Sequence, residues 1–237
     1  GDVYKRQVYN KYILGIKGRT IMYQKGIKRL LAVVLSACGL LVLSPLLLLL
    51  CLAIKLDSPG PVFFKQKRVG IHKSYFNILK FRTMRIDTPH DMPTHLLHDP
   101  EQYITRVGRF LRKTSLDELP QLINILRGDM SFIGPRPERP AIIAQYTEVM
   151  PEFAFRMKVK AGLAGFAQVY GKYNTSPYDK LKLDLTYIEN YSVWLDLKLM
   201  LLTLKVLFWP DSTEGVESEQ VTAFKAEYDG RAEKDDN

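Results

Sequence analysis

The chain has 237 residues and a formal charge of +9, with 34 lysines and arginines against 25 aspartates and glutamates. This length suits one domain of ordinary size together with an anchor, and the basic balance indicates an anionic partner such as nucleic acid, anionic lipid or a phosphorylated substrate. The two cysteines, Cys38 and Cys51, both lie in one apolar run, which excludes a disulfide framework elsewhere in the chain.

The chain begins with a leader that is followed by this long apolar run. Residues 1–24 show no periodicity that continues into the next segment, so we interpret them as a non-native or disordered leader. Residues 30–54 carry no charge and are numerous enough to cross a bilayer as a helix. A signal peptide is disfavoured, because the run is too long and no small-residue cleavage site follows it.

Ser44-Pro45 interrupts the apolar run, and both flanks of the run are basic. Proline removes a helical hydrogen bond, and the positive-inside rule places basic flanks on the cytoplasmic side. Two topologies therefore stay open: one spanning helix, or a re-entrant helix–break–helix hinged at Ser44-Pro45. In the second, the serine hydroxyl helps to satisfy the backbone group that proline leaves free. The basic flanking residues are Lys25, Lys28, Arg29, Lys55, Lys65, Lys67, Arg68 and Lys73.

Two strands are expected after the anchor, at residues 62–66 and 75–84. Alternation puts Lys80 and Arg82 on one face of the second strand. These cations belong either to a solvated edge strand or to a pair directed at phosphate. Residues 87–100 then contain three histidines, and a mobile loop explains them better than a metal site, because no cysteine or helical register supports metal binding. These histidines are His90, His95 and His98.

Two adjacent carboxylates, Asp117 and Glu118, precede a short apolar helix expected over residues 119–126. A carboxylate near cations and a helix N-terminus stays ionised, as a nucleophile requires, and a second carboxyl one residue away can handle a proton. The neighbouring cations are Arg109, Arg112 and Lys113.

The same motif also allows a purely structural interpretation. Ser115 and Glu118 have the spacing of a capping box. Pro120 counts against it, because with Ser115 as N-cap the proline would be the fifth helical residue, where a backbone N–H is needed. A helix that begins nearer Pro120 leaves both carboxylates at its mouth.

Further along, prolines on both sides of Arg136 restrict the backbone of Pro135-Arg136-Pro137. An arginine held in this way can meet an anion or stack on a base, unless the segment is only a rigid surface turn. Residues 161–171 form a glycine-punctuated loop and strand, without the spacing of a dinucleotide fingerprint or a Walker loop.

The other expected helices cover residues 101–111, 141–150, 178–191 and 193–209. The last is apolar but contains Asp196, so it is too charged for an ordinary span. It is either an amphipathic helix in the membrane interface or a plain core helix.

In this order the segments resemble the small bacterial sugar transferases, the monotopic phosphoglycosyl transferases that begin exopolysaccharide and glycoconjugate assembly. The match runs from about residue 28 to residue 208, and the ordered set is specific although each motif alone is weak. The motifs are the basic flank with Ser44-Pro45, and residues 80–84, 112–121, 128–137 and 183–196.

The resemblance implies an α+β protein, with a re-entrant helix–break–helix anchor and a small mixed catalytic domain that carries interfacial amphipathic helices. We accordingly divide the chain into a leader (1–24), an anchor (25–56), a catalytic domain (57–210) and a polar tail (211–237). The expected location is the bacterial cytoplasmic membrane with the catalytic domain on its cytoplasmic face. No nucleic-acid partner is expected, and the oligomeric state stays open.

The implied reaction moves a sugar-1-phosphate from a UDP-sugar to a polyprenol phosphate, expected to be undecaprenyl phosphate, with release of UMP and with Mg²⁺ as cofactor. In that family the aspartate of an adjacent Asp–Glu pair, the dyad, is the nucleophile and contacts Mg²⁺. This resemblance assigns both roles to Asp117, with Glu118 as its partner in the dyad. Lys80 and Arg112 match cations that hold the phosphates. Pro135-Arg136-Pro137 matches the loop linked to the uridine end. The expected intermediate is a covalent phosphosugar–aspartate.

One segment departs from the family pattern Pro-Gly-Ile/Leu-Thr-Gly-Trp-Ala-Gln-Val. Ala161 replaces the proline, Ala164 the threonine and Phe166 the tryptophan. The loss of a hydroxyl at position 164 bears on loop rigidity and sugar choice rather than on the core reaction. The sequence names neither the sugar nor the pathway.

Two other functions compete with this assignment. The first is a membrane-anchored adaptor that binds anionic lipid or nucleic acid, which would gain nothing from carboxylates among its cations. The second is a hydrolase with two carboxylates across a cleft, which adjacent residues on a helix do not provide because their side chains do not face each other.

Overall fold

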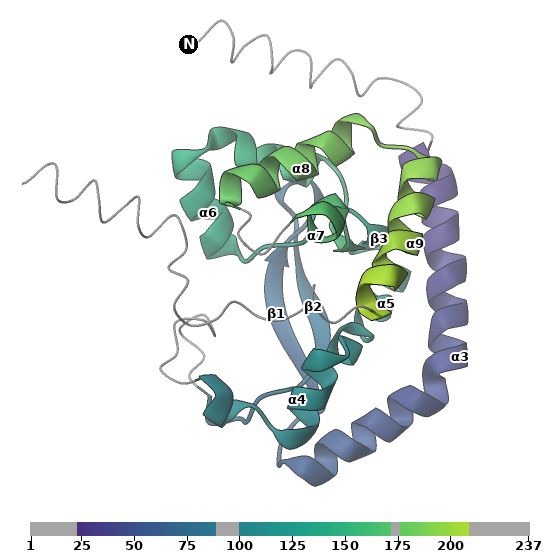
Figure 1. Cartoon of the computed structure of the whole chain (residues 1–237), viewed down its shortest axis with the longest axis vertical. Coiled ribbons are helices and arrows are strands. Elements are labelled where there is room, and N and C mark those ends of the chain that lie inside the picture. Colours follow the sequence, from purple (N-terminus) through teal and green to yellow (C-terminus); the bar gives the residue numbers. More distant parts are fainter. Residues whose placement is uncertain (1–22, 89–99, 172–175, 209–237) are drawn as a thin grey trace, which may run out of the picture.

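The computed structural model describes residues 23–88, 100–171 and 176–208 (Figure 1). Nearly all of the expected leader, the three histidines His90, His95 and His98, and the polar tail lie outside these residues. The described residues form a mixture of helices with two small sheets, as expected. The elements in chain order are η1 (Tyr23–Ile27), α3 (Lys28–Asp57), β1 (Phe63–Val69), η2 (Ile71–Lys73), β2 (Tyr75–Phe81), η4 (Pro100–Tyr103), α4 (Arg106–Lys113), η5 (Leu116–Glu118), α5 (Gln121–Arg127), β3 (Ser131–Ile133), α6 (Pro140–Val149), η6 (Pro151–Lys158), β4 (Gly162–Ala164), α7 (Phe166–Tyr170), α8 (Pro177–Glu189) and α9 (Val193–Phe208).

Helix α3 is the long apolar helix expected from the sequence. Within the described residues it is the one helix long and apolar enough to cross a membrane. Its inner face packs against the rest of the protein through Ala32, Leu50 and Ile54. Its outer face exposes large side chains, among them Leu41 and Leu56 at 76% and 79%. An apolar surface of this kind marks an interaction with a membrane or another protein.

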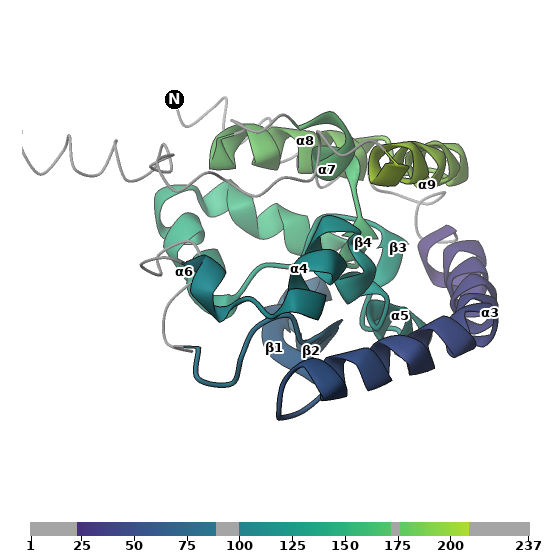
Figure 2. The same cartoon turned by 60° about the horizontal axis from the view of Figure 1, so that its bottom comes forward.

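Pro45 bends α3 without ending it. The helix is continuous from Lys28 to Asp57, and its axis changes direction between its first and second halves (Figures 1 and 2). Proline has no N–H for the carbonyl of Leu41, four residues earlier, and the hydroxyl of Ser44 donates to that oxygen at 2.7 Å. The hydroxyl therefore compensates as expected. The expected break is instead a bend, because one lost hydrogen bond kinks a helix without stopping it.

The same domain holds both ends of α3. Near the N-terminal end, the guanidinium of Arg29 donates to the carbonyls of Ile125 and Leu126, both at 2.7 Å, at the C-terminus of α5. At the other end, the carboxylate of Asp57 accepts from the N–H of Val107 at 3.0 Å, in the first turn of α4. The helix dipole favours both contacts, because a positive charge lies at the C-terminus of α5 and a negative charge lies at the N-terminus of α4.

Two strand pairs bring the remaining segments together. Strands β1 and β2 form an antiparallel hairpin in which Phe64 lies opposite Lys80, and in Figure 1 this hairpin extends from the α4 end of the domain toward α6 and α8. Strands β3 and β4 pair in parallel. Gly134, directly after β3, lies so close to the chain that leads into β4 that an added Cβ would be 2.3 Å from the carbonyl oxygen of Lys160. This close approach fixes where the following Pro135-Arg136-Pro137 segment starts.

Candidate active site

The two carboxylates lie in η5, a single 3-10 turn between α4 and α5. Ser115 adopts the left-handed conformation (φ 55°) and makes no side-chain cap hydrogen bond, so the capping-box interpretation is wrong. Helix α5 begins only after Pro120, which precedes its first residue. Asp117 and Glu118 therefore lie just before the N-terminus of α5, as the position of Pro120 in the sequence predicted.

Lys80 reaches the carboxylates from strand β2. Its ammonium lies 2.7 Å from Oε1 of Glu118 and 3.6 Å from Oδ2 of Asp117. The expected partner cation, Arg82, does not join it. The guanidinium of Arg82 is buried and donates to the carbonyls of Ser58 and Pro59, where it secures the turn after α3.

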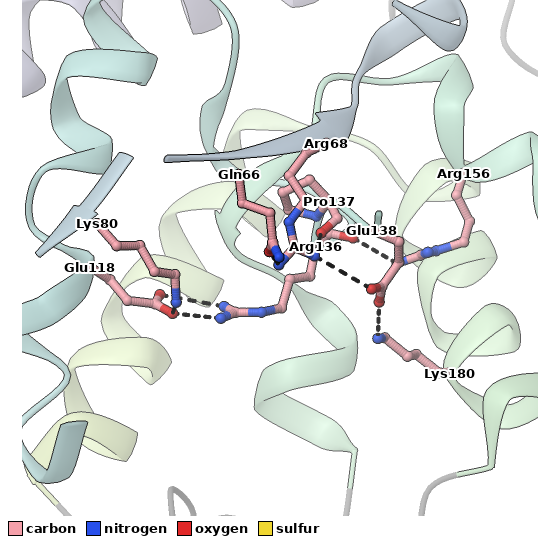
Figure 3. Close-up of polar contacts among 9 residues, drawn as sticks. All are labelled: Gln66, Arg68, Lys80, Glu118, Arg136, Pro137, Glu138, Arg156 and Lys180. Carbon is pink, nitrogen blue, oxygen red and sulfur yellow. Dashed lines mark hydrogen bonds and ion pairs between the residues drawn. The ribbon is translucent and has the colours of Figure 1, made fainter. Parts of the chain in front are cut away.

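Arg136 also reaches Glu118, and its guanidinium shares Oε1 of that carboxylate with the ammonium of Lys80 (Figure 3). Its two terminal nitrogens both donate to the Glu118 carboxylate, NH2 at 2.5 Å and NH1 at 3.4 Å. The sequence placed Arg136 only in a loop for the uridine end. The structure brings it to the dyad as well, 18 positions away along the chain.

The two neighbouring carboxyls differ in acidity. Burial alone would raise the pKa of Glu118, but Arg136 and Lys80 outweigh burial and hold this pKa at about 2. Burial raises the pKa of Asp117, and Lys80 offsets that effect only in part. The cations thus pair mainly with Glu118. Asp117 keeps a carboxylate that is 13% exposed and, within the described residues, makes its ion pair to Lys80 through Oδ2 alone.

Arg112 lies near the dyad without a direct ion pair to it among the described residues. Its Nε donates to the hydroxyl of Thr83 at 2.9 Å. Burial lowers the pKa of Arg112, and the charge of Asp117 works against this shift. The terminal nitrogens of the guanidinium therefore remain available to an anionic ligand beside Asp117.

A recess adjoins the Pro135-Arg136-Pro137 segment. It is shallow, with a cavity volume of about 20 Å³, and its wall includes Val69, Val159 and Arg156 besides the segment itself. The segment and the adjoining Glu138 are held by ion pairs and hydrogen bonds that involve Arg68, Arg156 and Lys180 (Figure 3). Sequence analysis named Arg68 only as a basic flanking residue and did not place any of these four residues at the segment, because isolated charges in unrelated elements carry no local pattern.

A magnesium ion at the dyad would need ligands from the substrate as well as from the protein. Within the described residues, no three histidine, cysteine or acidic side chains gather into a metal cage. Mg²⁺ typically uses one or two carboxylates together with substrate phosphates and water. Asp117, which the cations leave partly unpaired, fits such a shared site. The donor set therefore suits an ion that is bound jointly with a diphosphate.

Comparison with known proteins consistently finds bacterial sugar transferases. The family model described as bacterial sugar transferase matches residues 23–210. A UDP-glucose:undecaprenyl-phosphate glucose-1-phosphate transferase of Caulobacter vibrioides is 45% identical over 192 residues, 78% of this chain and 71% of that protein. A UDP-N-acetylgalactosamine-undecaprenyl-phosphate N-acetylgalactosaminephosphotransferase of Aeromonas hydrophila is 39% identical over 184 residues, 76% of this chain and 43% of that protein. An uncharacterized sugar transferase of Bacillus subtilis is 41% identical over 199 residues, 83% of this chain and 94% of that protein. The chain thus spans less than half the length of the Aeromonas relative.

Proposed function

Because the chain belongs to the bacterial sugar transferase family, we propose that it transfers a sugar-1-phosphate from a UDP-sugar to undecaprenyl phosphate and releases UMP. The observation that carries this proposal is the convergence of Lys80 and Arg136 on the adjacent carboxylates Asp117 and Glu118. A diphosphate needs cations, and a two-step transfer needs a nucleophile beside them. The relatives named above act on UDP-glucose in one case and UDP-N-acetylgalactosamine in another, so the sugar stays open.

In the proposed mechanism Asp117 attacks the β-phosphorus of the UDP-sugar. A bond forms between its carboxylate oxygen and phosphorus, the bond from this phosphorus to the bridging oxygen breaks, and UMP leaves with that electron pair. The phosphate oxygen of the lipid then attacks the same phosphorus and releases the Asp117 carboxylate. The covalent phosphosugar–aspartate divides one difficult transfer into two easier steps.

The cations around the dyad stabilise the charge that develops during both steps. Lys80 and Arg136 reach the dyad directly, and Arg112 lies close enough for the charge of Asp117 to oppose the lowering of its pKa. Glu118, whose pKa of about 2 keeps it ionised, orients Lys80 and Arg136 rather than donating a proton. A Mg²⁺ ion held by Asp117 and the substrate phosphates would add further charge neutralisation.

We place the uridine end of the substrate against the Pro135-Arg136-Pro137 segment, over the shallow recess beside it. The recess has apolar walls from Val69 and Val159 and lies next to Arg136, which also contacts the dyad. A nucleoside in this position would direct its phosphates toward Lys80 and Asp117.

For the membrane segment we propose a re-entrant topology at the cytoplasmic face of the bacterial inner membrane. It is supported by the bend at Pro45 and by the contacts of Arg29 and Asp57, which tie both ends of α3 to one domain. A straight spanning helix would carry those two ends to opposite faces of the bilayer. In a background with both native cysteines replaced by alanine, cysteines at Ile27 and Lys65 should both be labelled only from the cytoplasm. Labelling of position 27 from outside would restore the spanning topology.

We further propose that α9 lies in the membrane interface. It exposes Trp194 at 82% and Leu201 at 69%, while its acidic residue Asp196 is buried against Lys28. The exposed apolar side chains are thus free to enter the headgroup boundary.

The reaction itself is tested with a panel of UDP-sugars, undecaprenyl phosphate and Mg²⁺, with UMP as the readout. UMP should appear with at least one sugar and be absent with the Asp117→Asn variant, whose neutral amide is a poor nucleophile. Free sugar without lipid would indicate a hydrolase. Binding to anionic vesicles that falls steeply with salt, without UMP from any sugar, would indicate the adaptor instead.

A further inference from the structure

The active-site arginine lies in a segment whose backbone is held by two other arginines. The carbonyl of Arg136 accepts from NH2 of Arg156 at 3.0 Å, and the next carbonyl, of Pro137, accepts from NH1 of Arg68 at 3.0 Å (Figure 3). Arg68 comes from β1 and Arg156 from η6. Two elements far apart in the sequence thus hold the two consecutive peptide groups that flank Pro137, the first of which begins at Arg136.

Arg156 is itself fixed by a carboxylate on α8. Its Nε donates to Oδ2 of Asp184 at 2.6 Å, and the two side chains are 3% and 1% exposed. A guanidinium is planar and presents its donors in a rigid fork. With one edge held by Asp184, the NH2 group that reaches Arg136 has a defined direction.

Helix α8 supplies a second contact to the same segment. Lys180 lies four residues before Asp184, so both project from one face of the helix. The ammonium of Lys180 is 2.6 Å from Oε1 of Glu138, whose other carboxylate oxygen lies 3.8 Å from Arg68. Helix α8 therefore holds residues 136–138 through one acidic and one basic side chain.

From this geometry we infer that Asp184 and Arg156 are positioning residues for Arg136, and that they act through its backbone carbonyl. Arg136 has a partly exposed side chain, 38%, that ends at Glu118. Its backbone is the fixed point from which the guanidinium is directed. As far as catalysis is concerned, the inference rests on the proposed function, in which Arg136 stabilises the transferred phosphate.

The decisive variant is Arg156→Lys, which separates the ion pair from the contact to Arg136. A lysine keeps a cation for Asp184, but its single nitrogen cannot reproduce the two-sided fork. We expect the melting temperature to stay close to that of the parent chain while kcat falls about tenfold, because small displacements of a catalytic group are costly. A purely structural ion pair predicts that kcat stays unchanged or falls only together with stability.

A double-mutant cycle tests whether the effect passes through Arg136. Asp184→Asn should lower kcat in the parent chain but have no further effect on kcat in an Arg136→Ala background, since coupled residues are not additive. Asp179→Asn makes the same change on the same helix in an exposed pair with Lys182, and should leave kcat unchanged in both backgrounds. Equal losses from Asp184→Asn in both backgrounds would overturn the inference.

Hydrogen exchange of the full-length protein provides a readout that does not depend on activity. Pro135 and Pro137 carry no amide N–H, so the amides that report on the segment are those of Gly134, Arg136 and Glu138. In Arg156→Lys these three amides should exchange faster while those of α5 stay unchanged. Unchanged exchange at residues 134–138 would overturn the inference even if kcat fell. If the parent chain released no UMP from any UDP-sugar, the proposed reaction would be refuted, and the exchange result would still decide whether Arg156 holds the segment.

Discussion

The protein buries charge in two clusters that differ in how completely the charges are enclosed. In the anchor cluster, Lys28, Asp196, Tyr23 and Tyr187 satisfy one another. The ammonium of Lys28 lies 2.8 Å from the Asp196 carboxylate and donates to the carbonyl of Ile133 and the hydroxyl of Tyr187, while both tyrosine hydroxyls donate to Asp196 at 2.7 Å. This cluster joins α3 to α9.

The dyad cluster, formed by Lys80, Asp117, Glu118 and Arg136, is left open. Its side chains are between 13% and 38% exposed, against 9% and 8% for Lys28 and Asp196. Two cations pair mainly with one carboxylate, and Asp117 keeps capacity for another partner. The difference indicates that a cluster whose charges are all satisfied internally stabilises the fold, whereas a partly satisfied one beside a recess can bind a ligand.

The largest effect on stability should come from the anchor cluster. Asp196→Asn leaves the ammonium of Lys28 buried without its ionic partner, which should lower the free energy of unfolding by about 3–5 kcal/mol. The kcat of the enzyme that remains folded should not change. Thermal unfolding in detergent and UMP release per folded molecule measure the two quantities. A loss of kcat without a loss of stability would reverse the roles assigned to the two clusters.

Glu118 should make the stability of the dyad cluster depend on pH. Its folded pKa is lowered from 4.5 to about 2, so its contribution is complete above pH 4.5 and is lost as the pH falls toward 2. This lowering of the Glu118 pKa corresponds to at most about 3 kcal/mol of stability. Relative to Glu118→Gln, the parent chain should lose melting temperature across this acid range. Parallel curves for both proteins would show that Glu118 is not held as described.

Removing a cation from the dyad cluster should affect catalysis more than folding. Lys80→Ala and Arg112→Ala should each lower the rate by about 10²-fold, since each removes one contact to a phosphate. The melting temperature should change little, because Arg136 still pairs with Glu118. Lys67→Ala on the neighbouring strand removes an exposed cation and serves as the control. Full activity in either variant would remove that residue from the site.

The smallest effect on the purified enzyme is expected from Pro45→Ala, which lies outside both clusters. It supplies the N–H missing opposite Leu41 and straightens α3. Activity in detergent should be retained, while in membranes more of the chains should become labelled at position 27 from outside. If labelling stays entirely cytoplasmic, the bend does not determine the topology.

The local features of the fold were predictable from the sequence. The apolar run predicted the long helix α3, and Gly128 ends α5 in a left-handed conformation as expected. The position of Pro120 correctly predicted that the two carboxylates lie just before the N-terminus of α5. Alternation along β2 placed Lys80 and Arg82 on one face but could not show that only Lys80 turns to the dyad. That choice depends on where the carbonyls of Ser58 and Pro59 lie.

The long-range features were not predictable from a single sequence. The parallel pairing of β3 with β4 joins segments about 30 residues apart that have no pattern in common. The ion pair between Arg156 and Asp184 and the contact of Arg136 with Glu118 likewise join residues 28 and 18 positions apart. The family resemblance named the candidate site residues, whereas only the three-dimensional arrangement shows what holds them.

The central claim is that Asp117, the carboxylate left partly unpaired in the open cluster, carries the phosphosugar. Enzyme incubated with its UDP-sugar and Mg²⁺, without lipid acceptor, should release about one equivalent of UMP and gain the mass of a phosphosugar on the peptide that contains Asp117. Asp117→Asn should form no adduct, whereas Glu118→Gln can retain some. An adduct mapped to Glu118, or UMP release that requires the lipid acceptor from the first turnover, would contradict the account.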